Sequence, residues 1–519
     1  MNVVVIRKLK KGGREMGKQF INKIMSRKGN LYSLSFLIMI ISIIIGTSMV
    51  CEAVIAPASY VIYKSGTTYY AQNGQTGAND YSGTVVATVI QSAIDALTNG
   101  GKVFIKGDMG TLTTKLTLNS LISLEGEGFS SKLAIDASTP LIEIPNNAYN
   151  IIIKNLYLRN YSTAVASRIV YAVGTVNAFI AENNFLVGSN GPITIEGGGD
   201  VIIRGNIVQG CRTGIGGRNF YRVVMTGNTF FNATDNPIDV GNIYDADISG
   251  NIIYDSQTTP TTQTGIYVDS VMGHLNISDN LIRRVLVNGI QINSVASTAD
   301  YINITGNQIH YAGMTTGGES GIYLLGTATR NIRNVRIVGN RIGFSGRQGI
   351  LMEYVQNVLI EGNTIHDNGQ VSSTYGYGIR GDEAQEVIIE GNRLFNNTQY
   401  GIALFTNSNN YTITGNNVRG NTSGGINPYS GSTRLIKDNL GYNPVGYISP
   451  NPSVGASPWT YTNNDGVSED FRFTTTGGSI SDVTKNSQSL GTGGLYHLEP
   501  GESIVITYTG TGTAKRWGY

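Results

Sequence analysis

An asparagine recurs along most of this chain, usually in the pair Gly-Asn and about once every 22 to 33 residues. The positions are Asn155, Asn183, Asn206, Asn228, Asn251, Asn280, Asn307, Asn340, Asn363, Asn392, Asn416 and Asn439. A second pair, Gly-Ile, follows in most repeats, with its isoleucine at Ile215, Ile266, Ile290, Ile322, Ile350, Ile379, Ile402 and Ile426. A period of this length, built of strand-like segments, indicates a solenoid in which each repeat forms one coil.

Short runs of alternating apolar and polar residues precede the asparagines, as in Val201–Asn206 and Val358–Asn363. This alternation has the period of a β-strand, and Val, Ile, Thr and Tyr dominate the runs. We therefore expect about twelve coils, with parallel strands about 4.8 Å apart and the isoleucines stacked inside. Asparagine tolerates the left-handed turn conformation, and its amide both donates and accepts hydrogen bonds. The recurring asparagines are accordingly predicted to turn the chain and to form an amide ladder from coil to coil.

The segment before the repeats has a helical stripe of apolar residues over 85–98, then strand-like runs at 99–105 and 122–128. Together with the Gly-Asn-x-Ile and Gly-Ile repeats, this order resembles the right-handed parallel β-helix of the pectate-lyase-like superfamily. The resemblance covers roughly residues 60–443 and implies a helix that caps the open end of the coils. The turn at 106–111 departs from the family pattern, so we expect a distorted first coil. The superfamily includes lyases, hydrolases, epimerases and non-catalytic adhesins, and the resemblance therefore implies a fold more than an activity.

The expected fold class is all-β, with an N-terminal helical cap and a small C-terminal β-sandwich-like module. We divide the chain into a leader (1–53), the cap with the first coil (54–128), the β-helix (129–443) and the C-terminal module (444–519). A cluster of prolines marks the last boundary. The module has two candidate roles, as a cap for the coils or in attachment and carbohydrate binding.

The leader carries nine Lys and Arg against one Glu in its first 30 residues, followed by an apolar run over 34–50. This order is typical of a signal peptide or an uncleaved membrane anchor, and lipid attachment at Cys51 is a third reading. In each case the basic flank stays in the cytoplasm, so we expect the coils to be extracellular or at the cell surface. Without the leader the chain has 28 basic and 33 acidic residues, which gives no support to a nucleic-acid partner. Cys211 is then the only cysteine, so no intrachain disulfide is expected.

Several middle coils have longer connections than the rest. Three alternate coils extend the loop between the asparagine and the next Gly-Ile pair, at 256–264, 312–320 and 369–377. A second loop position expands at 294–300 and 326–334. Function on a rigid scaffold usually lies on loops, so we expect any groove beside these coils, with neutral variation of surface loops as the alternative.

The residue after each Gly-Ile isoleucine is expected to face outward and to stack on its equivalents in the neighbouring coils. This column reads Gly216, Asp239, Tyr267, Gln291, Tyr323, Leu351 and Arg380, and a second column two residues further on reads Arg218, Asp269, Asn293, Leu325, Glu353 and Asp382. A third column, three residues after the asparagine, reads Tyr254, Arg283, His310, Gly343 and His366. Aromatic faces suit the C–H faces of sugars, and amides and carboxylates suit their hydroxyls. We predict a carbohydrate polymer as partner, with substrate-binding residues Asp239, Gln291, Tyr323, Asn293 and Arg284.

Two chemistries suit such a surface. A lyase or C5-epimerase acting on a uronic acid needs a cation to neutralise the sugar carboxylate and a base to take the α-proton. The candidates are Arg283, His310 and Tyr267 for catalysis, and Asp239 and Asp269 as ligands of Ca²⁺. A glycoside hydrolase needs two carboxylates. The candidate pairs, each expected one coil apart in register, are Glu361 with Glu390 and Glu353 with Asp382.

The catalytic motifs of the superfamily are largely missing. Residues 236–239, Asn-Pro-Ile-Asp, keep only two positions of the Asp-Pro-His-Asp motif of mannuronan epimerases. The Arg-x-Pro-x-x-Arg motif of pectate lyases is absent. We therefore expect an exported, envelope-associated protein that binds an extracellular polysaccharide, with a uronic-acid type favoured, and that cleaves or epimerises it if it is an enzyme. The alternative is a non-catalytic adhesin, surface-layer or spike-like rod.

Overall fold

A computed structural model of the chain describes residues 58–255, 263–294, 298–314, 319–429, 433–442, 446–447, 451–464 and 467–518. The leader and parts of three predicted loops, at 256–262, 295–297 and 315–318, lie outside the described residues, and the predictions made for them stay untested. Within the described ranges, no helix is long and apolar enough to cross a membrane. Cys211 is buried and forms no disulfide.

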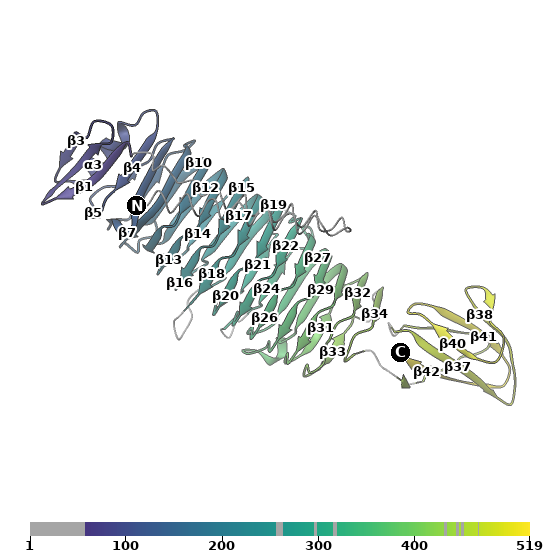
Figure 1. The fold of residues 1–519 in the computed structure, drawn as a ribbon. Helices are drawn as coiled ribbons and strands as arrows, with labels where there is room; N and C mark the ends of the chain where they lie inside the picture. The colour runs from purple at the N-terminus through teal and green to yellow at the C-terminus, as the bar shows by residue number, and fades with distance from the viewer. Residues whose placement is uncertain are drawn as a thin grey trace, which may run out of the picture. The chain divides into compact units, whose positions relative to one another are not determined.

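The repeats form a parallel β-solenoid of about 13 turns, close to the twelve expected. Each coil places strands on three faces, and the coil strands pair in parallel with their equivalents in the neighbouring coils (Figure 1). Because long strands bend from one face to the next, the faces join in one 34-stranded sheet.

We name the three faces by their sequence features. The Asn face holds the strands that follow the recurring asparagines: β11 (Phe185–Gly188), β13 (Ile207–Gln209), β16 (Thr229–Phe231), β18 (Ile252–Tyr254), β20 (Leu281–Arg283), β23 (Gln308–His310), β26 (Arg341–Gly343), β28 (Thr364–His366) and β30 (Arg393–Phe395). The Gly-Ile face holds β6 (Leu116–Thr117), β8 (Pro140–Ile144), β14 (Ile215–Arg218), β21 (Ile290–Asn293), β24 (Ile322–Leu325), β31 (Tyr400–Leu404) and β33 (Gly424–Asn427). The third face holds β4 (Gly101–Ile105), β15 (Arg222–Thr226), β22 (Ile302–Thr305), β25 (Ile332–Val338), β32 (Tyr411–Thr414) and β34 (Arg434–Lys437).

Long strands connect these faces. Those that run from the Gly-Ile face to the third face are β10 (Arg168–Glu182), β12 (Gly191–Arg204), β17 (Ile238–Ser249), β19 (Ile266–Ser278), β27 (Ile350–Glu361) and β29 (Ile379–Glu390). Two others run from the third face to the Asn face, β7 (Ile122–Ile135) and β9 (Tyr149–Asn160). A 3-10 turn, η1 (Ser373–Tyr375), lies in the loop before β29.

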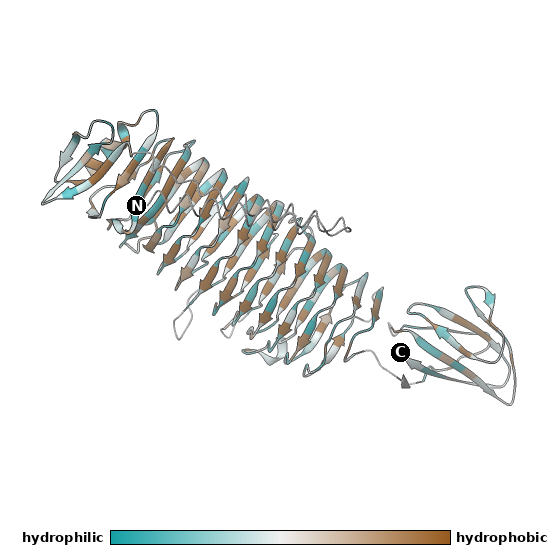
Figure 2. Ribbon diagram, in the orientation of Figure 1, coloured by the Kyte–Doolittle hydropathy of each residue, from teal (hydrophilic) through white to brown (hydrophobic). Residues whose placement is uncertain are grey.

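The core is a stack of apolar side chains inside the coils. The isoleucines of the Gly-Ile pairs lie in register on neighbouring strands and are at most 4% exposed, which confirms their predicted inward direction. Figure 2 shows the alternation along the strands, with apolar and polar segments following each other in every coil. A fully buried isoleucine contributes about 1.5–3 kcal/mol, so the stack is the main stabilising element of the solenoid.

The asparagine ladder is also present. Asn206 Nδ2 donates to Asn228 Oδ1 over 3.0 Å and to the carbonyl of Ala181 over 2.9 Å. The same Asn228 oxygen accepts the backbone N–H of Asn206 over 3.0 Å. This pattern continues coil by coil to Asn439, and every amide of the ladder is buried. The ladder thereby satisfies turn backbone that water cannot reach.

Two details of the predicted ladder are wrong. Its first asparagine is Asn184 rather than Asn183, and Leu156 rather than Asn155 occupies the corresponding place one coil earlier. The left-handed residue is the one before each ladder position: Asn155 and Asn183 have φ of 57° and 55°, where Gly205 has 65°. The bend requires positive φ, which Gly adopts freely and Asn tolerates, whereas the ladder position requires an amide.

The N-terminal end has more structure than the helical stripe indicated. Strands β1 (Tyr60–Ser65), β2 (Thr68–Asn73) and β3 (Asn79–Gly83) form an antiparallel meander, and β1 pairs in parallel with β4. The predicted helix is present as α3 (Val86–Asp95), with its apolar stripe buried. Strand β5 (Asp108–Leu112) pairs with β7 through a shifted register, so the first coil is distorted as expected.

The C-terminal module consists of two four-stranded antiparallel sheets. One contains β35 (Gly446–Tyr447), β37 (Glu469–Thr476), β40 (Leu495–Leu498) and β42 (Thr511–Gly518), and the other contains β36 (Trp459–Thr462), β38 (Ile480–Lys485), β39 (Gln488–Ser489) and β41 (Ser503–Tyr508). The two sheets share a core that includes Phe471, Leu498 and Ile506.

Candidate functional site

The first predicted outward column lies in register on the Gly-Ile face. Gly216 pairs with Asp239, Asp239 with Tyr267, and Tyr267 with Gln291. The register continues through Tyr323, Leu351 and Arg380. The second column, from Arg218 to Asp382, follows two residues further along the same strands. The face therefore presents two parallel rows of outward side chains along most of the solenoid.

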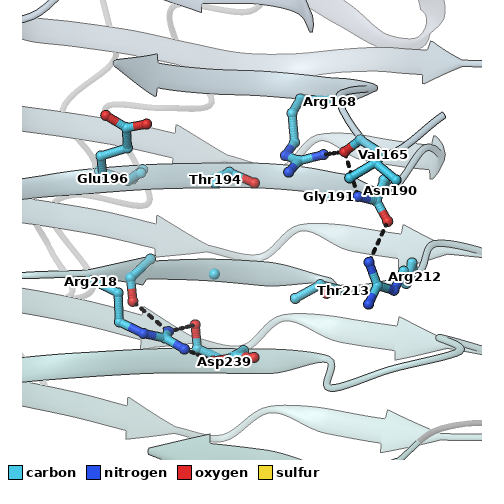
Figure 3. Close-up of a pocket in the computed structure, with 13 residues that line it drawn as sticks. Val165, Arg168, Asn190, Gly191, Thr194, Glu196, Arg212, Thr213, Arg218 and Asp239 are labelled. Carbon is cyan, nitrogen blue, oxygen red and sulfur yellow. Dashed lines mark hydrogen bonds and ion pairs between the residues drawn. The ribbon is translucent and has the colours of Figure 1, made fainter. Parts of the chain in front are cut away.

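A cavity opens where the first row lacks a side chain. Gly216 pairs with Thr194 on one side and Asp239 on the other, so a glycine stands between two side-chain-bearing positions. The cavity has a volume of about 470 Å³, and three arginines line it: Arg168, Arg212 and Arg218 (Figure 3). A Cβ built on Gly216 would meet its nearest atom, the carbonyl oxygen of Asp239, at 3.3 Å. The space is thus set by the glycine, and a longer side chain there would project into it.

Arg168, at the start of β10, forms no ion pair with a carboxylate among the described residues. Its guanidinium donates to the carbonyls of Val165 and Ser167, the latter over 2.9 Å. Burial lowers the pKa of Arg168, and the neighbouring charge of Arg212 acts in the same direction. The shift comes first from burial of the guanidinium, and a bound anion would offset that cost by supplying a counter-charge. Arg212 donates to Asn190 Oδ1 over 3.4 Å, and Figure 3 shows Arg168, Asn190 and Arg212 at one end of the cavity.

At the other end of the cavity, the carboxylates already have partners. Arg218 Nη2 lies 2.8 Å from Asp239 Oδ1, and Asn236 Nδ2 donates to Asp239 Oδ2 over 3.2 Å. The Tyr171 hydroxyl donates to Glu196, which raises the pKa of Tyr171 to about 12 and keeps the phenol neutral. The cavity therefore combines one cation without a counter-charge with two carboxylates that are held by neighbours.

Beyond Asp239 the face carries a chain of hydrogen-bonded polar side chains. Asn288 Nδ2 donates to Gln291 Oε1 over 2.8 Å, Gln291 Nε2 donates to Asn293 Oδ1 over 2.9 Å, and Asn293 Nδ2 donates to the Tyr267 hydroxyl over 2.8 Å. Burial raises the pKa of Tyr267, and the charge of Asp269 adds to the effect. Tyr267 is thus a neutral phenol with its own proton left to donate, which suits a hydrogen-bond donor to substrate better than the predicted base.

The structure separates the residues proposed for catalysis. Tyr267 lies on the Gly-Ile face, whereas Arg283 and His310 pair with each other on β20 and β23 of the Asn face. Within the described ranges, no hydrogen bond, ion pair or ring contact joins Tyr267 to either residue. Arg284, proposed for substrate binding, follows Arg283 with φ of 61°, and its backbone N–H donates to the carbonyl of His310 over 3.0 Å. The three catalytic candidates therefore do not form one centre in this arrangement.

His310 belongs to a stack of aromatic rings on the Asn face. Its ring centroid lies 6.4 Å from that of Phe344 and 6.3 Å from that of His366, which itself stacks on Phe395 at 5.2 Å. Burial lowers the pKa of His310, and its Nε2 is buried without a hydrogen-bond partner among the described residues. Burial favours the neutral imidazole, and the ring packs against its aromatic neighbours, which suits a structural role better than the predicted catalytic one.

The residues proposed for Ca²⁺ do not fit such a site. Asp269 pairs with Gly241, so it lies diagonally from Asp239 rather than opposite it, and Asp239 is already bound to Arg218. Calcium takes six to eight oxygen ligands. Among the described residues, no three His, Cys, Asp or Glu side chains gather to hold a metal ion. Dependence of the protein on Ca²⁺ stays a prediction.

The predicted carboxylate pairs are each in register on neighbouring coils. Glu353 pairs with Asp382 on the Gly-Ile face, and Glu361 with Glu390 on the third face. Glu353 accepts a hydrogen bond from the Tyr323 hydroxyl over 2.8 Å, and Asp382 accepts one from Arg380 Nε over 2.9 Å.

A further carboxyl, Glu319, was not singled out from the sequence. Burial raises the pKa of Glu319, the charge of Glu353 adds to the effect, and Arg347, 3.8 Å away, opposes it. Glu319 lies in the expanded loop at 312–320, and Tyr375, of the loop at 369–377, has its ring centroid 5.0 Å from the guanidinium carbon of Arg347. The described parts of these loops thus flank this end of the Gly-Ile face.

The loop lengths predicted a groove beside the middle coils, but the arginine-lined cavity lies in earlier coils. It is formed by β10, β12, β14 and β17, which precede the expanded loops. Sequence reasoning missed Arg168, Asn190 and Glu196 because the Gly-Ile pair is absent from their coils, and it missed Arg212 because this residue precedes Gly214-Ile215 and stands in none of the three columns. The available signal was Gly216 itself, a missing side chain in an outward column with arginines on both sides.

Comparison with known proteins gives a family for the fold. A family model described as a right handed beta helix region matches residues 140–297 and 264–464, together more than half of the chain. The match accords with the predicted handedness and with the observed coils. No curated protein matches the chain significantly by sequence.

Several solved structures are similar. The A-module of a mannuronan C-5 epimerase from Azotobacter vinelandii matches at 17% identity, covering 68% of this chain and 95% of that chain, with a TM-score of 0.44. Tailspike protein 3 of bacteriophage CBA120 matches at 12% identity, covering 81% and 72%, with a TM-score of 0.44. DFA-IIIase from Arthrobacter chlorophenolicus A6 matches at 12% identity, covering 63% and 90%, with a TM-score of 0.43. Likeness at this level says nothing of substrate or activity.

Proposed function

The chain belongs to the right-handed β-helix family, and we propose that the Gly-Ile face of its solenoid binds an acidic polysaccharide, of the uronic-acid type. The observation that carries the proposal is Arg168, a partly buried cation without a carboxylate partner among the described residues, beside a cavity floored by Gly216. A guanidinium group matches a carboxylate in two parallel hydrogen bonds, which makes arginine the preferred residue for this recognition. Arg212 and Arg218 line the same cavity, where each is already paired with a carboxylate, Arg212 with Asp235 and Arg218 with Asp239.

The rest of the face supports a polymeric ligand. Outward residues recur once per coil, so a chain lying along the solenoid meets a new set of side chains at each step. Tyr267 has a hydroxyl proton left to donate, and the amides of Gln291 and Asn293 hold it in place. Such fixed polar groups bind sugar hydroxyls at low entropic cost, because they are already ordered. The basic and apolar leader supports an extracellular or cell-surface location for this binding.

The proposal is tested by titration calorimetry of the full chain with oligogalacturonate, with oligomannuronate and with uncharged maltohexaose. Arg168→Ala should weaken binding of the acidic oligomers about 10- to 100-fold, because a charged hydrogen-bonding partner is worth about 1.5–3 kcal/mol. Arg204→Ala is the matched control, since Arg204 is an exposed arginine of β12 paired with Glu182 outside the cavity. Equal affinity for maltohexaose and the acidic oligomers, or unchanged binding by the Arg168 variant, would contradict the proposal.

A second candidate function, cleavage of the glycosidic bond, rests on Glu319 and Glu353. The raised pKa of Glu319 keeps its carboxyl group protonated to higher pH than usual, while Glu353 accepts a hydrogen bond from Tyr323. Glycoside hydrolysis needs one carboxyl group that donates a proton and a second that acts as base or nucleophile, and Glu319 and Glu353 are the candidates for these roles.

This candidate is tested by measuring reducing ends released from any polymer that the protein binds, with ultraviolet absorbance to detect unsaturated lyase products. Glu319→Gln should abolish the release of reducing ends while leaving binding at the arginine-lined cavity intact. Binding without either product would place the protein with the non-catalytic adhesins and rods.

A further inference from the structure

A second cavity, of about 390 Å³, lies on the third face and shares no residue with the arginine-lined cavity. It is formed by β15, β17, β19 and β22, which follow one another along the solenoid (Figure 1). Two outward columns border it, one of Arg222, Asp245, His274 and Tyr301, the other of Val224, Asp247, Asn276 and Asn303. Ala246 lies between the columns, at an inward position of β17. We refer to this cavity as the trough.

One border of the trough is aromatic and exposed. The Tyr301 side chain is 56% exposed, and its ring lies 5.2 Å from that of His274 at an angle of 30°. Tyr221 and Tyr244 stack at 5.1 Å just beyond this border, and both are exposed. Exposed aromatic rings that lie side by side offer a flat apolar surface to the C–H faces of a ligand.

The opposite border is a ladder of polar side chains. Asn276 Nδ2 donates to Asp247 Oδ1 over 2.8 Å, and Asn303 Nδ2 donates to Asn276 Oδ1 over 3.1 Å. In the described part of the chain, the second amide hydrogen of Asn303 and the Oδ2 atom of Asp245 have no hydrogen-bond partner. The trough thus offers one free donor and one free acceptor across from an aromatic face, which is the combination that a ring with hydroxyl groups on its edge and C–H groups on its face requires.

The charge of the trough determines whether it binds neutral or acidic rings of this kind. Arg222 is bound through two nitrogens to Asp200, over 2.5 and 2.7 Å, so its charge is already balanced. Asp245 and Asp247 then leave the trough negative, which repels a sugar acid. From the exposed ring, the polar ladder and the negative charge, we propose that the trough binds a neutral pyranose ring, with its C–H face on Tyr301 and its hydroxyl groups on Asp245 and Asn303.

This site is independent of the proposed function, because the trough and the arginine-lined cavity lie on different faces. The trough binds a neutral sugar, whereas the cavity binds an acidic one. The test is saturation-transfer NMR on the full chain with cellohexaose, maltohexaose and mannohexaose, and with oligogalacturonate as the acidic probe. At least one neutral hexasaccharide should receive saturation, strongest at the C–H protons of one ring face. Tyr301→Ala should reduce its affinity about five- to tenfold, as expected for loss of one aromatic contact.

Tyr149→Ala is the control for the loss of an exposed tyrosine, since Tyr149 is 47% exposed on β9, away from the trough. Asn303→Ala is a second variant that keeps the ring and removes the free donor, in case the tyrosine variant fails to fold. Arg168→Ala should leave neutral-sugar binding unchanged, which separates this result from failure of the proposed function. Absence of transfer to all three neutral sugars, stronger transfer to oligogalacturonate than to every neutral sugar in the Arg168→Ala variant, or transfer unchanged in both the Tyr301 and Asn303 variants would overturn the proposal.

Discussion

The arginine-lined cavity and the trough are built in the same way and carry opposite charge. In each, outward side chains of neighbouring strands border an open space, which lies at Gly216 of an outward column in the cavity and between two outward columns in the trough. The cavity has Arg168 without a counter-charge, whereas the trough has Asp245 and Asp247 beyond the one balanced arginine. The coil backbone therefore fixes where a ligand fits, and the outward residues decide which ligand it is. Because inward and outward positions alternate along each strand, a site can change its charge without any change in the core.

Reversing the charge of the cavity should have the largest effect. Arg168→Glu removes the unpaired cation and places a carboxylate beside the bound acid, so affinity for oligogalacturonate should fall more than about 100-fold. Titration calorimetry measures the loss, with Arg204→Glu as the control for charge reversal outside the cavity. Neutral hexasaccharide binding at the trough should remain, and its loss would show that the two sites are coupled.

Filling the cavity should have the next largest effect. Gly216→Leu projects a side chain into the space between Thr194 and Asp239, and should weaken acidic-oligomer binding at least about tenfold by excluding the sugar. A Cβ at Gly216 would lie 3.3 Å from the carbonyl oxygen of Asp239, a tight contact, so the thermal unfolding midpoint of Gly216→Ala measures the cost of the added Cβ by itself. Gly216→Ala, which fills less of the space, should lie between the wild type and Gly216→Leu. Equal affinity in all three would mean that the sugar acid binds elsewhere.

Reversing the charge of the trough should have a smaller effect. Asp247→Lys makes the trough less negative and adds a cation, so weak binding of oligogalacturonate should appear there, with a gain of about two- to fivefold over the wild type at this exposed site. Saturation-transfer NMR in an Arg168→Ala background isolates this contribution. Asp136→Lys, at an exposed position directly after β7, is the control for a reversed charge outside the trough.

A pH effect should be the smallest of these. Because the pKa of Glu319 is raised in the folded protein, its contribution to stability is fully present below the ordinary glutamate pKa of 4.5 and is lost as pH rises through the folded pKa. Glu319→Gln should remove this dependence, so the variant gains stability relative to the wild type as pH increases, by a few tenths of a kcal/mol after screening by solvent. Urea unfolding at a series of pH values measures the difference. A constant difference across that range would mean that Glu319 is not buried against Glu353.

The architecture and much of the surface could be predicted from the sequence because the coil length is nearly constant. Counting from one Gly-Ile pair to the next placed Asp239, Tyr267 and Gln291 in register, and strand pairing confirms this. The same counting could not separate Asn183 from Asn184, because the spacing fits both and only the bend conformation distinguishes them.

The relation between faces could not be predicted. Arg283 and Tyr267 are close in sequence, but the direction of each face is set by the bend between strands, which residue spacing does not encode. Arg168 lies in a coil without a Gly-Ile pair, so it belonged to no column, and its significance depends on burial and on the absence of a carboxylate, which a sequence does not show.

The asparagine ladder also determines how the solenoid responds to force. Each amide hydrogen bond runs along the stacking axis, from one coil to the next, and joins residues 22 to 33 positions apart in the chain. Force applied to the C-terminal end therefore acts on one amide hydrogen bond of the ladder at a time, beginning with the bond between Asn416 and Asn439. Extension should proceed in steps, and each step should release one coil of the chain.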